Sequence, residues 1–442
     1  MKIPVHHAVV LGCGASGAAA ALLLRREGAG VTVVDRVRPG AERCAELEAA
    51  GVQVMPSESE LPGGAFDLCV VSPGVPVNSP WISAARARGI PVLAELELGW
   101  SRRGAGIKTI AVTGSNGKSC AVKWIAESLA ASGLRVAIAG NYGPPVCQVV
   151  LEQPDLDWLV LEVSSFQLET VRDFRAEVGI LLNLAPNHLD RHGDFATYRQ
   201  AKARLFARTL PDDVCMVHEA CAREVREDAG GAGRWFTFGG VGDFTYECGR
   251  IMRGELAVAG VEGTCFGNAV LGSNAAGVLG ALSVAGLDVR ASERVAKVFQ
   301  PLPHRMEVVA EARGIRFIND SKATTLTALS AAVRMCGGGV RLICGGLLKE
   351  YDLLAVKEVL AQRASGVYLI GRASEQMASA WSDVVPCMKC GALDAAVTTA
   401  WREARGGEVV LLSPGCASFD QFKNFEVRGE QFRQLATSLA RE

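Results

Sequence analysis

No uninterrupted apolar run of about 18 residues occurs in this sequence, so we expect no transmembrane helix. It also lacks a surplus of positive charge, because 46 Lys and Arg residues are balanced by 47 Asp and Glu residues, for a formal net charge of −1. Neither nucleic acid nor an anionic membrane is therefore an expected partner. The N-terminus has no basic segment and no cleavage-site pattern, so we expect no signal peptide and a cytoplasmic protein.

The composition is that of a folded globular protein. Hydrophobic residues make up 49% of the chain and charged residues 21%, which excludes a largely disordered chain. The length of 442 residues suggests about three domains. The 14 cysteines are spread through apolar runs and resemble small buried hydrophobic residues rather than a disulfide framework.

Short apolar runs alternate with helix-period stretches along the chain and predict an α/β fold with doubly wound, mostly parallel sheets. Examples of the predicted strands are His7–Leu11, Leu68–Val71 and Val409–Leu412. A polar, glycine-containing link follows Trp100, and a proline-rich link lies at 301–303. These links predict domains of about residues 1–100, 101–303 and 304–442.

A glycine turn, GCGASG, follows the first predicted strand and precedes an alanine-rich helix. The next strand ends in Asp35. Such a strand–turn–helix lets the backbone approach a diphosphate at the positive end of the helix. The pattern does not separate NAD, FAD and a UDP-sugar, and a tight turn without a ligand stays a further alternative.

A second glycine turn, TGSNGKS, follows the predicted strand at 109–112 and indicates a P-loop that binds phosphates. It departs from the full Walker pattern, because Val112 stands where the first glycine is expected. Glu162 ends a later strand, where a carboxylate is well placed to hold Mg²⁺. Taken alone, His188 would be a structural histidine and Lys202 a solvated helix lysine.

Together these segments resemble the Mur ligase family. The strings TGSNGKS, LEVSSFQLE, NHLDRHGDFATYRQAK, LPHRME and NDSKAT occur in the family's order, and LLSPGCASFDQFKNFEVRG resembles the members that use D-glutamate. The resemblance covers essentially the whole chain. It implies a Rossmann-like N-terminal domain, a central P-loop ATPase domain and a Rossmann-like C-terminal domain. It also implies that the first glycine turn binds a UDP-sugar and not NAD.

The implied activity is an ATP-dependent ligation that joins D-glutamate to UDP-N-acetylmuramoyl-L-alanine during peptidoglycan precursor synthesis. An acyl phosphate and a tetrahedral intermediate would form, and ADP and phosphate would be released. The implied cofactor is Mg²⁺, as two ions that Mn²⁺ could replace, and Lys202 would be carbamylated so that it offers an anionic oxygen to the metal. We expect a monomer whose partners are the three substrates.

The resemblance also assigns residues by position. The expected catalytic residues are Lys118, Glu162, His188 and Lys202, and the metal ligands are Ser119, Glu162, His188 and Lys202. ATP would contact Gly114, Ser115, Asn116, Gly117, Lys118, Ser119, Cys120, Asn274, Arg305 and Asp320. The UDP-sugar would contact Gly14, Ala15, Ser16, Asp35, Arg36, Gly74 and Asn141, and D-glutamate would contact Thr324, Lys349, Ser418 and Phe425.

Several positions depart from the family pattern, among them Asn187 in place of Asp, Gly277 in place of Asn, and Thr325 in place of Asn. We expect these to alter nucleotide affinity more than the chemistry. Two other functions stay open. The first turn and Asp35 also suit an NAD-dependent oxidoreductase, and the departures suit a non-catalytic nucleotide-binding module.

Overall fold

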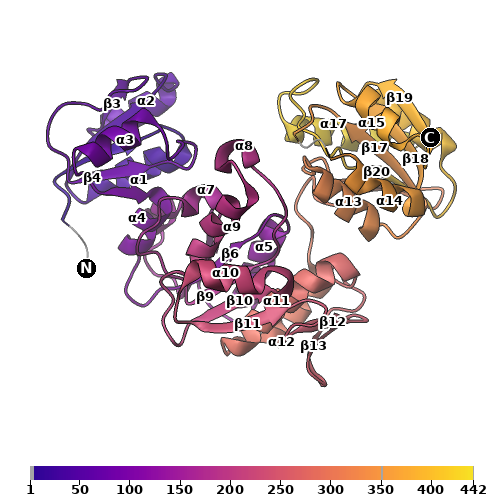
Figure 1. Ribbon diagram of the computed structural model, residues 1–442, viewed down its shortest axis with the longest axis horizontal. Helices are drawn as coiled ribbons and strands as arrows, with labels where there is room; N and C mark the ends of the chain where they lie inside the picture. The colour runs from indigo at the N-terminus through magenta and orange to yellow at the C-terminus, as the bar shows by residue number, and fades with distance from the viewer. Residues whose placement is uncertain (1–3, 350–351, 442) are drawn as a thin grey trace. The chain divides into compact units, whose positions relative to one another are not determined.

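The computed structural model describes residues 4–349 and 352–441, and the side chain of Asp190 lies outside this description. The chain divides into two compact units, one of residues up to 267 together with 271–298, the other of 268–270 and 299–442. Each unit is built of parallel sheets between helices, as the alternating pattern predicts (Figure 1). No helix among the described residues is long and apolar enough to span a bilayer.

The first sheet of the first unit has five parallel strands in the order β3-β2-β1-β4-β5. Its central strands β1, β2 and β4 are buried on both faces, which explains their continuous apolar runs, whereas the edge strand β3 is largely exposed. The strands are β1 (His7–Leu11), β2 (Gly30–Asp35), β3 (Gln53–Pro56), β4 (Leu68–Val71) and β5 (Val92–Ala94); the helices are α1 (Ala15–Arg26), α2 (Ala41–Ala49), α3 (Pro80–Ala87) and α4 (Glu95–Arg102).

The second sheet of this unit has six parallel strands in the order β11-β10-β9-β6-β8-β7, so the P-loop strand β6 lies between β9 and β8. The carboxyl ends of these neighbouring strands form one edge, and the site is built there. The strands are β6 (Lys108–Thr113), β7 (Val136–Gly140), β8 (Trp158–Glu162), β9 (Val178–Leu181), β10 (Val214–His218) and β11 (Arg234–Phe238). The helices are α5 (Lys118–Ala131), α6 (Val146–Glu152), α7 (Ser165–Leu168), α8 (Leu189–His192), α9 (Phe195–Ala203), α10 (Ala222–Ala229), α11 (Ala269–Val284) and α12 (Val289–Val298), with short 3₁₀ turns at Arg204–Phe206 and Glu219–Cys221.

A small antiparallel sheet of β12 (Thr245–Glu247), β13 (Arg250–Arg253) and β14 (Leu256–Gly260) follows the second sheet along the chain. The sequence pattern does not predict it, because β12 and β13 are short and rich in polar residues, and the apolar run of β14 is short and half exposed.

The second unit has a six-stranded sheet in the order β15-β16-β20-β17-β18-β19, parallel except for the antiparallel edge strand β15. Two apolar layers cover its faces. The strands are β15 (Glu307–Ala312), β16 (Ile315–Asn319), β17 (Val340–Gly345), β18 (Ala364–Ile370), β19 (Cys387–Gly391) and β20 (Val409–Leu412); the helices are α13 (Leu326–Met335), α14 (Leu354–Arg363), α15 (Ser374–Trp381), α16 (Leu393–Glu403) and α17 (Phe425–Leu439).

Candidate functional site

The predicted P-loop connects β6 to α5. Gly114 and Gly117 have φ angles of 147° and 85°, a backbone that side chains with a Cβ rarely adopt. A Cβ on Gly117 would lie 2.6 Å from Nδ2 of Asn274, so α11 places the predicted adenine contact directly against the loop. The Lys118 ammonium donates to the carbonyls of Gly114 and Ser115, at 2.9 and 3.0 Å. These contacts bring the lysine, the glycines and Asn274 into one site.

The segment after β9 supports the loop from outside. The Ser115 hydroxyl donates to the Ala185 carbonyl at 2.9 Å and lies 3.0 Å from the Tyr198 hydroxyl. The Asn116 amide N–H donates to Oδ1 of Asn183 at 2.9 Å. Sequence reasoning missed the roles of Asn183 and Tyr198, although Tyr198 is four residues from Lys202 on α9 and therefore on the same helix face.

Glu162 ends β8 beside the P-loop strand, and its side chain is buried. Its Oε1 accepts from Nδ2 of Asn141 at 2.6 Å, whereas its buried Oε2 has no hydrogen-bond partner. Asn141 was expected to contact the UDP-sugar. The structure places it after β7, at the edge of the second sheet and beside Glu162.

Lys202 is buried on α9 and is not the solvated helix lysine that its sequence neighbourhood alone suggests. Its ammonium nitrogen donates to the Gly114 carbonyl at 2.9 Å and to the Thr113 hydroxyl at 3.2 Å. Burial lowers the pKa of Lys202 well below its usual value; the charge of Lys118 lowers it further, and that of Glu162 acts in the opposite direction. Lys118, Glu162 and Lys202 therefore form one electrostatic cluster.

His188 lies on the loop after β9, where it precedes α8 with a left-handed φ of 55°. It is exposed, and its ring centroid is 4.8 Å from that of Phe166 in an edge-on contact. The neighbouring His192 is buried instead: its Nε2 lies 3.0 Å from the Ser165 hydroxyl. Sequence reasoning did not single out His192, whose buried ring also packs against Phe166 and Tyr198.

The residues at this edge fit a divalent cation with oxygen ligands. The buried, unpartnered Oε2 of Glu162 is the kind of atom that a metal satisfies. Ser119 is buried at the first turn of α5 and supplies a hydroxyl. In the part of the chain that the structure describes, no three or more His, Cys, Asp or Glu side chains are grouped so that they could hold a metal ion by themselves. Such a sparse donor set suits Mg²⁺, which keeps several waters and phosphate oxygens among its ligands.

The first glycine turn lies at a cavity of about 570 Å³ in the N-terminal sheet. Gly14 caps α1 without a side-chain bond, which leaves the helix N-terminus to its backbone N–H groups. The Asp35 carboxylate accepts from the backbone N–H groups of Cys13 and Arg36, at 2.6 and 2.7 Å, and so holds the turn. The lining includes six of the seven predicted UDP-sugar contacts, namely Gly14, Ala15, Ser16, Asp35, Arg36 and Gly74.

The remaining predicted contacts belong to the second unit. Asp320 is buried at the end of β16, where it accepts from the Ser413 hydroxyl at 2.9 Å and the Met306 N–H at 3.2 Å. Burial raises the pKa of Asp320 to about 7, against the opposing effects of these hydrogen bonds and of Arg305. Thr324 is partly buried and Lys349 is exposed.

Phe425 and Ser418 are linked by a buried arginine that sequence reasoning missed. The Phe425 carbonyl accepts from the Ser321 hydroxyl at 2.8 Å. Arg428 donates to Ser321 and to the Cys416 carbonyl, two residues before the buried Ser418. One guanidinium thus holds the loop after β16 and the loop after β20 together.

Three of the departures from the family pattern have structural roles. A Cβ on Gly277 would lie 2.7 Å from the ring of Phe238, so the glycine makes room for that aromatic side chain. Thr325 caps α13, because its hydroxyl accepts from the Ala328 N–H at 3.2 Å. Asn187 likewise accepts from the His188 N–H at 2.9 Å through its Oδ1. Each replacement residue is accommodated by local packing or hydrogen bonding.

Comparison with known families matches three profiles in order along the chain: the Mur ligase MurD-like N-terminal domain at residues 6–94, the Mur ligase middle domain at 112–246, and the Mur ligase glutamate ligase domain at 304–416. The UDP-N-acetylmuramoylalanine–D-glutamate ligase of Acidobacterium capsulatum is 38% identical over 460 residues, covering 98% of this chain and 97% of the relative.

Two solved structures share the fold. The UDP-N-acetylmuramate–alanine ligase of Thermotoga maritima aligns with a TM-score of 0.59 at 17% identity, covering 99% of this chain and all (100%) of that one. The bifunctional folylpolyglutamate synthase/dihydrofolate synthase of Yersinia pestis, complexed with AMPPNP and a Mn ion, aligns with a TM-score of 0.56 at 17% identity, covering 78% and 92%. The full-length match at 38% identity favours a ligase over an oxidoreductase or a non-catalytic module. The chain therefore belongs to the Mur ligase family, among the UDP-N-acetylmuramoylalanine–D-glutamate ligases.

Proposed function

We propose that this protein joins the amine of D-glutamate to the carboxylate of UDP-N-acetylmuramoyl-L-alanine at the expense of ATP, a step of peptidoglycan precursor synthesis. The observation that carries the proposal is the gathering of Lys118, Glu162 and Lys202 beside a P-loop, in a chain that is similar over its full length to ligases of that name. This cluster provides charge where a phosphoryl group would be transferred.

The chemistry explains the need for ATP. A free carboxylate is a poor acyl donor, because its leaving group would be oxide. Transfer of the γ-phosphoryl group to a carboxylate oxygen gives an acyl phosphate and ADP. The neutral amine of D-glutamate then adds to the carbonyl carbon, and the tetrahedral intermediate collapses with loss of phosphate and a proton. Lys118 and the N–H groups of its loop would neutralise the charge that two anions bring together.

Ser119, Glu162, His188 and Lys202 are the residues that we propose to hold Mg²⁺ or Mn²⁺, as two ions. The unpartnered Oε2 of Glu162 supports this proposal. When bound, the metal supplies positive charge that draws electrons away from the reacting phosphorus and screens the approaching carboxylate. Glu162 is itself held in place by Asn141.

Lys202 is proposed to be carbamylated. Its burial favours the neutral amine, the form that adds to CO₂; a C–N bond forms and a proton is released. The product carries an anionic oxygen, a ligand that Mg²⁺ accepts, whereas an ammonium group repels it. A Lys202→Ala variant should lose activity by about 10²–10³-fold, as expected for one electrostatic group, and short carboxylates should restore part of it.

The control for this experiment is Lys123→Ala, on the neighbouring helix α5, where the lysine pairs with Glu127 on the surface. This variant should keep full activity, with no response to added carboxylate. Full activity of Lys202→Ala without any carboxylate would remove Lys202 from the mechanism.

The other substrate contacts are proposed by position. The cavity at the first glycine turn would hold the UDP moiety, and Asn141 would face the acyl end of the sugar nucleotide. Asn274, Arg305 and Asp320 would contact the adenosine of ATP, and Thr324, Lys349, Ser418 and Phe425 would form the D-glutamate pocket.

A coupled ADP-release assay tests the proposed function. ADP should appear only when UDP-N-acetylmuramoyl-L-alanine and D-glutamate are both present, and a panel of amino acids should single out D-glutamate. With ¹⁸O in the substrate carboxylate, one labelled oxygen should leave in the inorganic phosphate. Unlabelled phosphate would exclude the acyl-phosphate route.

Two further expectations accompany this function. We propose that the enzyme works in the cytoplasm, where ATP and UDP-linked precursors are available. We also propose that it is a monomer, which a light-scattering mass close to 46.6 kDa would support and a doubled mass would contradict.

A further inference from the structure

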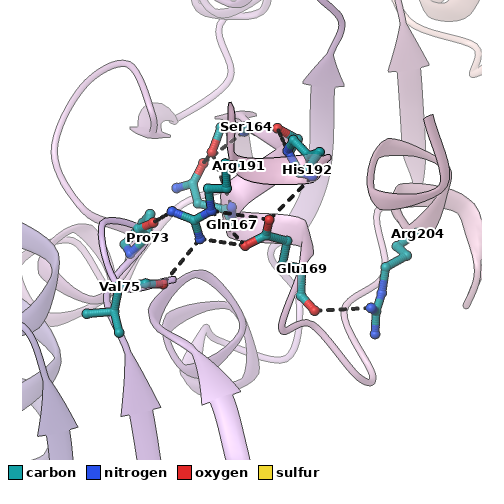
Figure 2. A network of polar contacts seen from close by, with 9 residues as sticks. Pro73, Val75, Ser164, Gln167, Glu169, Arg191, His192 and Arg204 are labelled. Carbon is teal, nitrogen blue, oxygen red and sulfur yellow. Dashed lines mark hydrogen bonds and ion pairs between the residues drawn. The ribbon is translucent and has the colours of Figure 1, made fainter. Parts of the chain in front are cut away.

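Arg191 on α8 connects the second sheet to the N-terminal cavity (Figure 2). Its Nη1 donates to the Pro73 carbonyl at 2.8 Å, and its Nη2 donates to the Val75 carbonyl at 3.1 Å. Residues 72–76 form the loop after β4 that lines the cavity proposed for the UDP moiety. One guanidinium from the second sheet therefore holds the backbone of this loop at two points.

The opposite edge of the guanidinium is fixed by Glu169. Arg191 Nη2 lies 2.5 Å from Oε2 of Glu169, and its Nε lies 3.2 Å from the same oxygen. The two side chains are only 14% and 9% exposed. His192 Nδ1 lies 3.4 Å from Oε1 of Glu169, and Arg204 donates to the Glu169 backbone carbonyl at 3.0 Å (Figure 2). The carboxylate thus holds Arg191 in one orientation.

The face of the guanidinium stacks on Phe166. Its central carbon lies 4.0 Å from the ring centroid, and the same ring contacts His188 edge-on. His188 is three residues before Arg191 and is the N-cap of α8. The planar guanidinium contacts carbonyl oxygens, a carboxylate and an aromatic ring at the same time. The ammonium group of a lysine is not planar and could not make all of these contacts.

We propose that Arg191 is a positioning residue for the sugar nucleotide. It fixes the loop of residues 72–76 relative to the second sheet, so that a substrate held in the N-terminal cavity is presented to the site beside His188 and the P-loop. This inference rests on the proposed function. The guanidinium of Arg191 is already paired with Glu169 and with the two backbone carbonyls. Arg191 can therefore act on the substrate through the loop, without contact with the reacting atoms.

Steady-state kinetics of Arg191→Lys test the proposal. The variant keeps a positive charge near Glu169 but loses the fork that reaches both carbonyls. We expect KM for UDP-N-acetylmuramoyl-L-alanine to rise about tenfold, the factor that corresponds to about 1.4 kcal/mol. KM for ATP should stay within about twofold, because Arg191 has no part in the loop of residues 114–120.

Arg204→Lys is the matched control, since Arg204 binds Glu169 and Val171 through backbone carbonyls and none of its contacts reaches residues 72–76. It should leave both KM values unchanged. A merely structural role of Arg191 would lower the melting temperature and kcat and leave both KM values at wild-type levels, and this result would overturn the proposal.

Binding of UDP alone, measured by calorimetry, separates this inference from the proposed function. If wild type releases no ADP with the named substrates, the proposed function fails, yet Arg191→Lys should still weaken UDP binding several-fold relative to Arg204→Lys. Glu169→Gln should shift KM for the sugar nucleotide in the same direction as Arg191→Lys, and the double variant should fall short of the summed effects. Unchanged UDP affinity in Arg191→Lys, or full additivity, would contradict the positioning role.

Discussion

The two glycine turns of the first unit share a strand–turn–helix design but differ in what surrounds them. The turn after β1 is held by Asp35, whose carboxylate accepts hydrogen bonds from two backbone N–H groups, and Gly14 is the N-cap of α1. The turn after β6 is surrounded by two lysines and a buried glutamate, Lys118, Lys202 and Glu162. Both backbones can bind phosphate, whereas only the second has side chains that favour its transfer.

The difference between the two turns therefore lies in the side chains that neighbouring elements bring to each backbone. Glu162 comes from β8 and Lys202 from α9, two elements that approach β6 only in the folded sheet. At the first turn, the loop after β4 contributes Gly74, and the charged residues among the described lining of the cavity, Asp35 and Arg36, are not buried.

The largest effect should come from Lys118→Ala. Removal of a cation at the site of phosphoryl transfer should lower ligase activity by about 10³-fold, because it stabilises charge that develops in the transition state. UDP binding at the first turn should persist, and ADP release together with calorimetry would measure both. Loss of UDP binding in the same variant would contradict the idea that the two turns bind their ligands independently. Lys123→Ala on the same helix is the control.

Gly17→Ala should have the next largest effect, and it acts on the first turn alone. A Cβ on Gly17 would lie 1.8 Å from the Gly12 carbonyl oxygen, so the turn and α1 must move apart. We expect the free energy of unfolding to fall by about 3 kcal/mol, as for other steric conflicts within a core, together with weaker UDP binding. Thermal unfolding would measure it. Gly106→Ala, in a loop, meets no atom within 4 Å and should change stability little; equal melting temperatures for the two variants would contradict the argument.

A smaller effect concerns Glu95, at the start of α4. Its carboxylate accepts a hydrogen bond from the Cys147 N–H of α6 at 2.8 Å and so connects the helix after the first sheet to a helix of the second. Burial raises the pKa of Glu95 to about 7 from its ordinary value of 4.5. The folded state therefore binds this proton more tightly than the unfolded state, so Glu95 contributes stability that is fully present below pH 4.5 and is lost as the pH rises through about 7. Glu95→Gln should flatten this decline, which is on the order of 2 kcal/mol between pH 5 and 8.

Chemical unfolding across that pH range would measure the Glu95 effect. The exposed Glu42→Gln should retain the wild-type slope. The number of unfolding transitions gives a second result. If wild type unfolds in one transition and Glu95→Gln in two, Glu95 also couples the unfolding of the two sheets. An unchanged slope would show that the buried carboxyl does not lose its proton within this range.

Local sequence was sufficient to predict where the two glycine turns lie and that Glu162 ends a strand. The strands predicted at His7–Leu11, Leu68–Val71 and Val409–Leu412 have the observed bounds, because fully buried parallel strands leave a continuous apolar run. A carboxylate at the end of such a strand must lie at the edge where the parallel strands end. The antiparallel strands β12–β14 left no such signal and were not predicted.

Contacts between distant loops could not be predicted in this way. Asn141 stays a predicted UDP-sugar contact, but its hydrogen bond to Glu162, 21 residues away along the chain, left no signal in the sequence. Arg191 and Arg428 gave no signal in the sequence, because an arginine on an exposed helix and one in a buried network look alike until the loops they join are in place.

The sequence by itself determined where the phosphate-binding backbones occur, since glycines between an apolar strand and a helix specify that local conformation within a few residues. Only the tertiary structure decided which side chains serve them. Burial of Lys202 and the two-sided contacts of Arg191 depend on segments that are up to 118 residues apart, and the pKa and orientation of a side chain are set by what packs around it.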